Sequence, residues 1–318
     1  GTKNADRPNI QYIRKGSIIM ITAQNLTKTF DKFTALENLS CSIPNGCIYG
    51  LVGSNGAGKS TLLRLITGIY RPDKGEVLID GKRVYDNPEV KRRFVFVPDE
   101  LYFLPQSNMN RMASLYKSVY PGFDGQRFEQ LAHAFNLDPN AKLQTFSKGM
   151  KRQAATILAL SVKPDFIFFD ETFDGLDPVM RNLVKKVIYA DVCERKATAV
   201  ITSHSLRELE DTCDQLALLH KGGIIFESDI ENLRTSLFKL QVAFSEPYDQ
   251  SLFSDMNIVS FVKKGSIASI IARGDKERAV AQIKALNPLL VEALPLTLEE
   301  VFIYEMEALG YSFEDALN

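Results

Sequence analysis

The glycine-rich loop at residues 53–60 restricts the fold more than any other segment, and it reads Gly-Ser-Asn-Gly-Ala-Gly-Lys-Ser. An apolar run at 48–52 precedes the loop and a helix-like stretch at 61–66 follows it. A strand, this loop and a helix form the context in which the pattern G-x-x-x-x-G-K-[ST] binds phosphate. Glycines let the backbone wrap around an anion, and the helix N-terminus presents unpaired N–H groups to it. The pattern therefore predicts a phosphate-binding loop, with a chance glycine turn as the alternative.

The residue types within this loop indicate individual roles. Lys59 is placed to reach the β- and γ-phosphates of a nucleotide, and the Ser60 hydroxyl is placed to bind Mg²⁺. The segment expected to bind ATP comprises Gly53, Ser54, Asn55, Gly56, Ala57, Gly58, Lys59, Ser60 and Thr61.

The composition is that of an ordinary globular protein and excludes several classes. Of the 318 residues 45% are hydrophobic, and a net charge of −1 predicts no strong nucleic-acid footprint. Four cysteines without C-x-x-C spacing and three histidines argue against a zinc site. No apolar run approaches the ~18–20 residues of a membrane-spanning helix, and residues 1–17 lack the apolar core of a signal peptide.

Strand-like and helix-like segments alternate through the first two thirds of the chain. Residues 108–160 read as mostly helical with a break at Pro121, and Asp177 followed by Pro178 predicts another helix start. Alternation of this kind predicts an α/β core with a parallel sheet. The predicted strands cover 18–26, 36–43, 48–52, 76–79, 94–97, 166–169 and 197–202, followed by a hairpin of 216–219 and 224–226.

The pattern changes near residue 237 and predicts a small α+β unit. Thr297 and Glu300 form a capping box for its last helix, and Gly310 lies just past the end of that helix. The expected strands are 238–244, 258–262, 266–272 and 289–291, and the expected helices are 275–286 and 297–309. One face of the last helix is more typical of core packing than of a partner groove, and it consists of Leu298, Val301, Phe302 and Leu309.

We therefore expect three parts of the chain. Residues 20–236 form a nucleotide-binding domain and residues 237–318 form a small accessory domain. Residues 1–19 are an N-terminal extension, native or left over from cloning, since Met20 is a candidate natural start.

Two acids follow the apolar run at 166–169. Asp170 is placed to hold Mg²⁺, and Glu171 is placed to polarise an attacking water. An exposed acidic turn is the alternative, but the phosphate-binding loop in the same chain favours the catalytic interpretation.

Residues 146–150 read Phe-Ser-Lys-Gly-Met and resemble the Leu-Ser-Gly-Gly-Gln signature of ABC-type ATPases. The motifs stand in that family's order, and the resemblance covers roughly residues 21–233. Residues 175–178, Gly-Leu-Asp-Pro, resemble the family's D-loop, and His204 stands where the family has its switch histidine, with a surface loop histidine as the alternative.

The resemblance implies a P-loop ABC-type ATPase domain with a mixed β-sheet core and a helical subdomain, followed by the small α+β domain. It implies Glu171 and His204 as catalytic residues, and Phe30 as the aromatic that stacks on adenine, with Phe33 as the second candidate. The other ATP contacts that it implies are Ser147, Lys148, Gly149 and Asp177. In such a fold the signature acts on the ATP of a second cassette, so that two ATP molecules join a homodimer or heterodimer.

The sequence departs from the family pattern at several positions. The signature carries Lys148 and Met150 where glycine and glutamine are usual, and Thr172 stands where proline is common. Asp99 occupies the position of the glutamine that meets Mg²⁺ and couples to the membrane domain. A carboxylate is a suitable oxygen donor for Mg²⁺, so Asp99 is the predicted replacement and Gln106 is a weaker candidate.

The resemblance also implies a partner. A cassette without a spanning helix is expected to energise a separate transmembrane permease from the cytoplasmic face of the cell membrane, with the segment 101–136 as the docking subdomain. The runs Val-Pro-Asp-Glu, Tyr-Pro-Gly-Phe-Asp and Phe-Ser-Lys-Gly-Met are most similar to the YtrB-like, ABC-2 type group of bacterial exporters. The alternative is a soluble ABC ATPase that acts on ribosomes or DNA; those resemble two fused cassettes or carry a long coiled coil, and this chain shows neither. A nucleotide switch without hydrolysis is disfavoured by the presence of Glu171 and His204.

Overall fold

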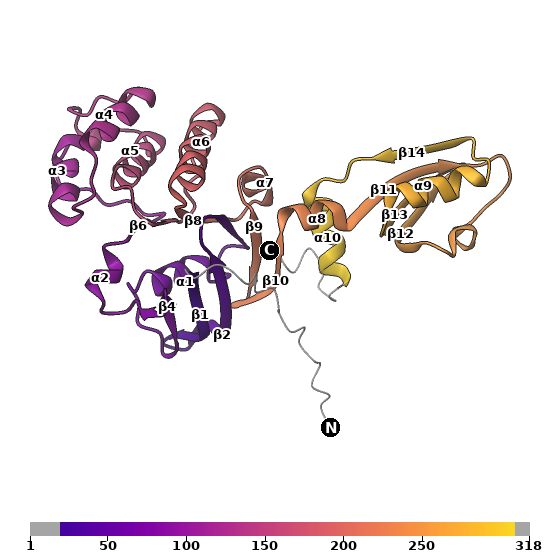
Figure 1. Cartoon of the computed structure of the whole chain (residues 1–318), viewed down its shortest axis with the longest axis horizontal. Coiled ribbons are helices and arrows are strands. Elements are labelled where there is room, and N and C mark those ends of the chain that lie inside the picture. The colour runs from indigo at the N-terminus through magenta and orange to yellow at the C-terminus, as the bar shows by residue number, and fades with distance from the viewer. Residues whose placement is uncertain (1–19, 309–318) are drawn as a thin grey trace.

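The computed structural model describes residues 20–308, and a six-stranded sheet forms its centre (Figure 1). The strand order is β10-β9-β3-β8-β7-β6, and all neighbours are parallel except β9 and β10, which form a hairpin. The predicted parallel core with a terminal hairpin is confirmed. The strands are β3 (Ile48–Val52), β6 (Phe94–Val97), β7 (Phe166–Phe169), β8 (Thr198–Ser203), β9 (Gln215–His220) and β10 (Gly223–Asp229).

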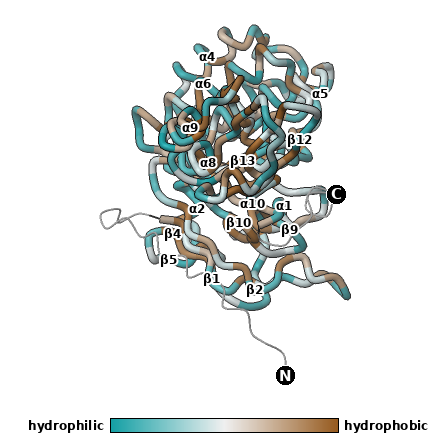
Figure 2. The backbone as a smooth tube through the Cα atoms, turned by 90° about the vertical axis from the view of Figure 1, so that its right-hand side faces the viewer, coloured by the Kyte–Doolittle hydropathy of each residue, from teal (hydrophilic) through white to brown (hydrophobic). Residues whose placement is uncertain are grey.

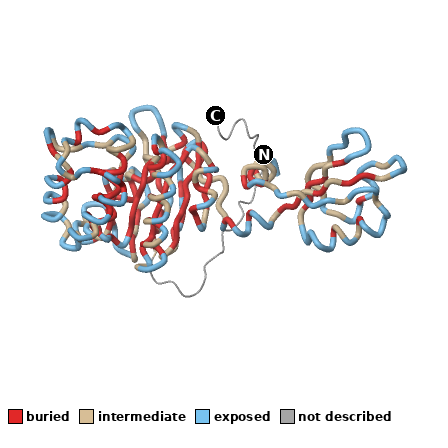
Figure 3. The backbone as a smooth tube through the Cα atoms, turned by 90° about the horizontal axis from the view of Figure 1, so that it is seen from above, coloured by how far each residue is buried: buried red, intermediate tan, exposed pale blue. Residues whose placement is uncertain are grey.

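Both faces of this sheet are covered, and every residue of β3, β7 and β8 is buried (Figure 3). Successive side chains of a strand point to opposite faces. Accordingly Ile167 and Phe169 belong to one hydrophobic cluster, whereas Phe166 and Phe168 belong to another. Figure 2 shows hydrophobic segments around β10 of this sheet. Burial on both faces explains why β7 reads as an uninterrupted apolar run.

A second, antiparallel sheet and the helix α1 (Lys59–Ile66) cover one face. The first two strands pair as a hairpin, and their register shifts three times between Ala23 and Thr29. The strand predicted at 18–26 therefore runs on to Phe30, because these irregularities interrupt the period-two alternation. The sheet has the order β2-β1-β4-β5 and consists of β1 (Met20–Phe30), β2 (Phe33–Pro44), β4 (Lys74–Ile79) and β5 (Lys82–Arg83).

Helices cover the opposite face. The segment predicted as mostly helical divides into separate helices, and a short 3-10 turn (Leu143–Thr145) precedes the signature. The predicted Asp177 cap is confirmed, since its carboxylate accepts from the first turn of α6. The helices of this face are α3 (Met109–Val119), α4 (Gly125–Ala134), α5 (Lys148–Ser161), α6 (Pro178–Arg195), α7 (Leu206–Leu209) and α8 (Ile230–Ser236). The short helix α2 (Pro88–Lys91) packs through Val90 in the cluster that contains α1.

The chain then builds a third sheet, which lies apart from the first two (Figure 1). Its order is β12-β13-β11-β14, and all three pairings are antiparallel. The helix α9 (Lys276–Ala285) contributes Ala279 and Ile283 to the core of this unit. The strands are β11 (Leu237–Ala243), β12 (Asn257–Lys264), β13 (Ile267–Arg273) and β14 (Leu290–Leu294).

The last described helix, α10 (Leu298–Ala308), packs back onto the part that contains the six-stranded sheet. Its capping box is confirmed: the Glu300 carboxylate accepts the Thr297 N–H, and the Thr297 hydroxyl accepts the Glu300 N–H. Leu298, Val301 and Phe302 are buried in the same cluster as α7, as the core-packing interpretation predicts. Leu309 and Gly310 lie outside the described residues, as do residues 1–19.

Candidate nucleotide-binding and catalytic site

The phosphate-binding loop lies between β3 and α1 and folds over Lys59. The Lys59 ammonium donates to the carbonyl oxygens of Gly53, at 2.7 Å, and Ser54, at 3.1 Å. Gly58 caps α1 with a φ of 107°, in the region that favours glycine. A Cβ on Gly53 would lie 2.4 Å from the carbonyl oxygen of Leu219. The loop geometry therefore depends on glycine at both positions.

The rest of the loop lies where a ligand can reach it. Asn55 and Gly56 are exposed, and Ser54 is half-buried, whereas Ala57 is buried against the protein. Gly56 has a φ of 80° and open space where a Cβ would stand. Ser60 and Thr61 follow in the first turn of α1, whose N-terminus is a favourable place for an anion.

Asp170 lies at the carboxyl end of β7, directly beside α1. One carboxylate oxygen accepts from the Ser60 hydroxyl at 3.1 Å and from the Thr202 hydroxyl at 2.8 Å. The other carboxylate oxygen is buried and has no hydrogen-bond partner. Burial raises the pKa of Asp170, while the two hydroxyl bonds oppose this shift. An orphaned carboxylate oxygen beside a serine hydroxyl fits a hard cation such as Mg²⁺.

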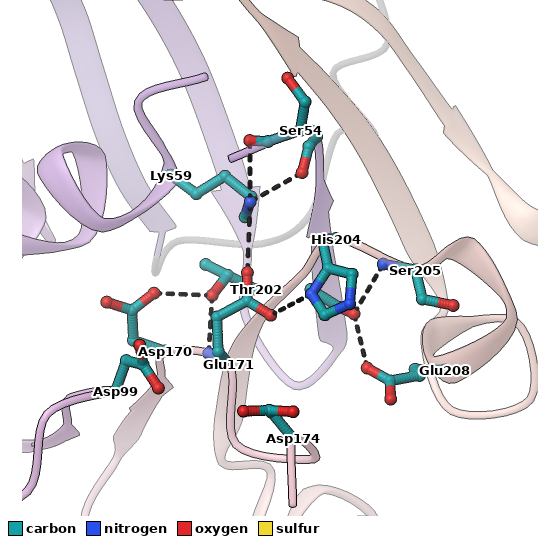
Figure 4. Close-up of polar contacts among 12 residues, drawn as sticks. Ser54, Lys59, Asp99, Asp170, Glu171, Asp174, Thr202, His204, Ser205 and Glu208 are labelled. Atoms are coloured by element: carbon teal, nitrogen blue, oxygen red, sulfur yellow. Dashed lines mark hydrogen bonds and ion pairs between the residues drawn. The ribbon is translucent and has the colours of Figure 1, made fainter. Parts of the chain in front are cut away.

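The Glu171 side chain lies between Lys59 of the phosphate-binding loop and His204 (Figure 4). Its carboxylate lies 3.2 Å from the Lys59 ammonium and 3.1 Å from His204 Nδ1. The backbone of Glu171 has a φ of 49°, an uncommon conformation for a residue with a side chain. The Glu171 N–H donates to the Thr202 hydroxyl at 2.9 Å, which anchors this turn to β8. The Glu171 carboxylate thus contacts both Lys59 and His204 in this structure.

The signature residues make polar contacts within their own neighbourhood. The Ser147 hydroxyl accepts from an N–H of the first turn of α5, and Lys148 forms an ion pair of 2.7 Å with Asp174. A Cβ on Gly149 would lie 2.8 Å from the carbonyl oxygen of Gly175. The signature and the D-loop therefore pack against each other. Their roles in ATP binding stay predictions.

The remaining predicted contacts lie in exposed positions. Asp177 accepts from the N–H groups of Val179 and Met180, so its carboxylate serves as a helix cap in this structure. Phe30 is 39% exposed and packs edge-on against Tyr70 at 5.3 Å between ring centroids. Phe33 is 61% exposed. Phe30 is thus both accessible and held by a neighbour, which suits an adenine-stacking residue.

Asp99 is held by an arginine. Its carboxylate lies 2.7 Å from the guanidinium of Arg152, which is 1% exposed. Mg²⁺ binding by Asp99 stays a prediction, and it competes with this ion pair for the carboxylate. Gln106 is exposed and lies in a turn with a φ of 55°.

Two functional-site residues were not assigned roles from the sequence. Thr202 holds both acids at the end of β7, and Arg152 joins Asp99 to the Asp170 carbonyl oxygen, at 3.4 Å. The signal for Thr202 is a polar residue that ends an apolar strand. For Arg152 the signal is weaker, because a charged residue inside a helix is ordinarily exposed.

The fold and this site define a P-loop ATPase cassette of the ABC class. The family model for ABC transporters matches residues 36–174. The ABC transporter ATP-binding protein YtrB of Bacillus subtilis is 30% identical over 284 residues, which cover 89% of this chain and 97% of the relative. The chain therefore belongs to the ATP-binding proteins of ABC transporters, and it is an ATPase.

Further similarities extend along the chain and to solved structures. The daunorubicin/doxorubicin resistance ATP-binding protein DrrA of Streptomyces peucetius is 28% identical and covers 89% of this chain and 91% of the relative. A solved ATP-binding subunit of an ABC transporter matches with a TM-score of 0.62 and 26% identity, covering 68% of this chain and 92% of that one. A dimeric cassette bound to ADP and Pi shares the fold, with a TM-score of 0.61, 23% identity, and coverage of 66% and 98%. Within residues 20–308, no helix combines the length and apolar character needed to cross a membrane.

Proposed function

We propose that this chain is the nucleotide-binding subunit of an ABC exporter and that it drives transport through ATP-dependent pairing of two cassettes. The observation that carries the catalytic part is the position of the Glu171 carboxylate between Lys59 and His204, at 3.2 and 3.1 Å. The export direction is supported by the similarity to relatives whose names link them to drug resistance.

Substrate binding is assigned to the loop and α1. The N–H groups of the loop and of the helix N-terminus receive the phosphates, and Lys59 supplies the positive charge for the β- and γ-phosphates. Phe30 provides an aromatic face for the adenine. Because Lys59 also lies against Glu171, a bound phosphate competes for the lysine and frees the Glu171 carboxylate for chemistry.

The metal site is assigned to Ser60 and Asp170. When bound, Mg²⁺ neutralises the charge that develops on the phosphate oxygens. The buried and unpartnered oxygen of Asp170 is the group in this chain that suits the metal, and Thr202 keeps the carboxylate oriented by binding its other oxygen.

Hydrolysis is assigned to Glu171 and His204. Glu171 accepts the proton of the attacking water as general base. His204 holds the carboxylate through Nδ1, and Thr202 fixes the backbone of Glu171. These contacts reduce the freedom of the base before the substrate arrives.

Pairing of two cassettes is assigned to the signature and the D-loop. Ser147, Lys148 and Gly149 stand at the N-terminus of α5, which suits binding of the γ-phosphate held by a second chain. Asp177 belongs to the adjacent D-loop. The second chain is another copy or a related cassette.

The proposed membrane partner is a separate permease, with this chain on its cytoplasmic side. Segment 101–136 is the proposed docking region. Large apolar side chains are exposed there: Tyr102 is 78% exposed, Leu115 41% and Val119 51%. Such side chains are typical of the core of a protein interface. We propose residues 20–236 as the cassette and 237–318 as the accessory domain, although α10 of the latter packs on the former.

The experiment is affinity capture of the Glu171→Gln chain with ATP from gently solubilised native membranes, followed by mass identification. The matched control is the Glu171→Gln, Lys59→Ala double variant, which is expected to lose ATP. We expect a stoichiometric multi-spanning protein with the single variant and less with the double variant. Recovery of ribosomes or DNA without a membrane protein would overturn the transporter assignment.

A further inference from the structure

The helix α10 contacts both parts of the molecule through acidic side chains. Glu299 accepts from Arg207 of α7 at 2.8 Å, on the ATP-binding part. Glu300 pairs with Lys239 of β11 at 3.1 Å, on the accessory sheet. A movement of α10 therefore changes its contacts with α7 and with the accessory sheet at the same time.

Glu305 provides a second contact between α10 and the accessory sheet. Its two carboxylate oxygens accept from both terminal nitrogens of Arg273 in β13, at 2.7 and 2.9 Å. A two-point contact between guanidinium and carboxylate fixes relative orientation as well as distance. The accessory sheet therefore moves with α10.

The apolar face of α10 rests on the segment that follows the switch histidine. Phe302 is 1% exposed and packs edge-on against Phe226 at 5.6 Å between centroids. It belongs to the same hydrophobic cluster as Leu206 and Leu209 of α7. Because α7 begins two residues after His204, the packing of Phe302 helps to set the position of the His204 backbone.

A cavity of about 390 Å³ lies at this contact, and His204, Leu206, Glu299 and Phe302 are among the residues that line it. His204 is 52% exposed, and its side chain contacts Glu171 through Nδ1 at 3.1 Å. The switch segment therefore has room to shift, and α10 forms one wall of that space.

We infer that Arg207, Glu299 and Phe302 are positioning residues for His204, so that α10 links the accessory sheet to ATP hydrolysis. This inference depends on the proposed catalytic role of His204. All three residues lie on α7 and α10, outside the nucleotide loop. They act by holding the segment that carries the histidine, and a displacement of about 1 Å at a catalytic group lowers the rate up to about 100-fold.

The test is charge reversal across the Arg207–Glu299 pair, whose side chains are 79% and 33% exposed. The variants are Arg207→Glu, Glu299→Arg and the double variant, with kcat and KM for ATP measured in the full chain. We expect each single change to lower kcat about 10-fold without changing KM, and the double variant to restore kcat.

The chain offers a matched control in the Arg83–Glu76 pair. The Arg83 guanidinium lies 2.7 Å from the Glu76 carboxylate, and the two side chains are 78% and 37% exposed. For Arg207 and Glu299 the corresponding values are 2.8 Å, 79% and 33%. Arg83→Glu is expected to leave kcat unchanged. Equal kcat for Arg207→Glu, Arg83→Glu and the unmodified chain would overturn the inference.

The contact between α10 and the accessory sheet is tested in the same way, with Arg273→Glu, Glu305→Arg and their double variant. We expect kcat to fall in the single variants and to recover in the double variant. An unchanged kcat in the single variants would overturn the link to the accessory sheet. The unmodified chain and Glu171→Gln are measured alongside, so that an ATPase insensitive to Glu171→Gln counts against the proposed function itself.

Discussion

The Asp99 carboxylate lies 2.7 Å from the guanidinium of Arg152, which is buried inside the helix that follows the signature. The same guanidinium donates to the carbonyl oxygen of Asp99 at 3.3 Å and to that of Asp170 at 3.4 Å. One buried arginine therefore joins the segment after β6, the signature helix and the end of β7. A shift of the Asp99 segment reaches the proposed metal carboxylate through a single residue.

Asp99→Ala is expected to lower the free energy of unfolding by about 1–3 kcal/mol, because it leaves a buried guanidinium without its anionic partner. Because the ion pair with Arg152 competes with the predicted metal role for the Asp99 carboxylate, we expect the ion pair to prevail and the Mg²⁺ concentration for half-maximal ATPase activity to stay nearly unchanged. Chemical denaturation and a Mg²⁺ titration measure the two effects. A stability equal to that of the unmodified chain, with a tenfold higher Mg²⁺ requirement, would instead support Asp99 as a metal ligand.

Glu171→Gln is expected to reduce the ATPase rate by ~10²–10⁴-fold, since an amide cannot accept the proton of water. ATP binding is expected to persist, because Lys59 and the loop are unchanged. Single-turnover hydrolysis and equilibrium binding of ATP separate the two steps. Lys59→Ala is the contrasting variant, and it is expected to weaken binding itself. A Glu171→Gln chain that turns over at the normal rate would show that another group is the base.

Short sequence patterns correctly predicted those helix and strand ends that are set by contacts between residues close together in the chain. The bounds of β7 follow from a run of four apolar residues, and the start of α6 follows from Asp177 and Pro178. The capping box of α10 is likewise a contact between residues three apart. Sequence patterns report such short-range contacts directly.

Contacts between residues far apart in the chain could not be predicted from such sequence patterns. Thr202 reaches Asp170 from another strand, and Arg152 reaches Asp99 across 53 positions. The amphipathic face of α10 predicted burial, but not that it packs on α7. A pattern shows that a face is apolar and does not identify the surface that covers it.

Glu227→Gln is expected to change how stability depends on pH. The Tyr49 hydroxyl donates to the Glu227 carboxylate at 2.6 Å, and burial raises the pKa of Glu227 above its ordinary value of 4.5. The folded chain therefore favours the protonated acid. Its stabilising contribution is complete below about pH 4.5 and is lost as the pH rises through the raised pKa.

The glutamine variant keeps a hydrogen-bond acceptor for Tyr49 and cannot ionise. Its melting temperature relative to the unmodified chain is therefore expected to rise as the pH increases above about 4.5. Thermal unfolding of both chains between pH 4 and pH 8 measures this difference. A difference that stays constant across the range would show that Glu227 titrates normally in the folded chain.

Gly53→Ala is expected to disrupt both the fold of the phosphate loop and ATP binding. The added Cβ would lie 2.4 Å from the Leu219 carbonyl oxygen and 3.2 Å from the Ala57 side chain. The first of these neighbours is backbone of β9, which cannot rotate away, so the loop itself must shift. Gly223→Ala is the matched control, because its Cβ would meet nothing closer than 3.9 Å. We expect weaker ATP binding and a lower melting temperature for Gly53→Ala only, by isothermal titration and thermal unfolding. Equal ATP affinity in the two variants would mean that the loop can bind phosphate in a shifted position, and that its close packing against β9 is not required for the site.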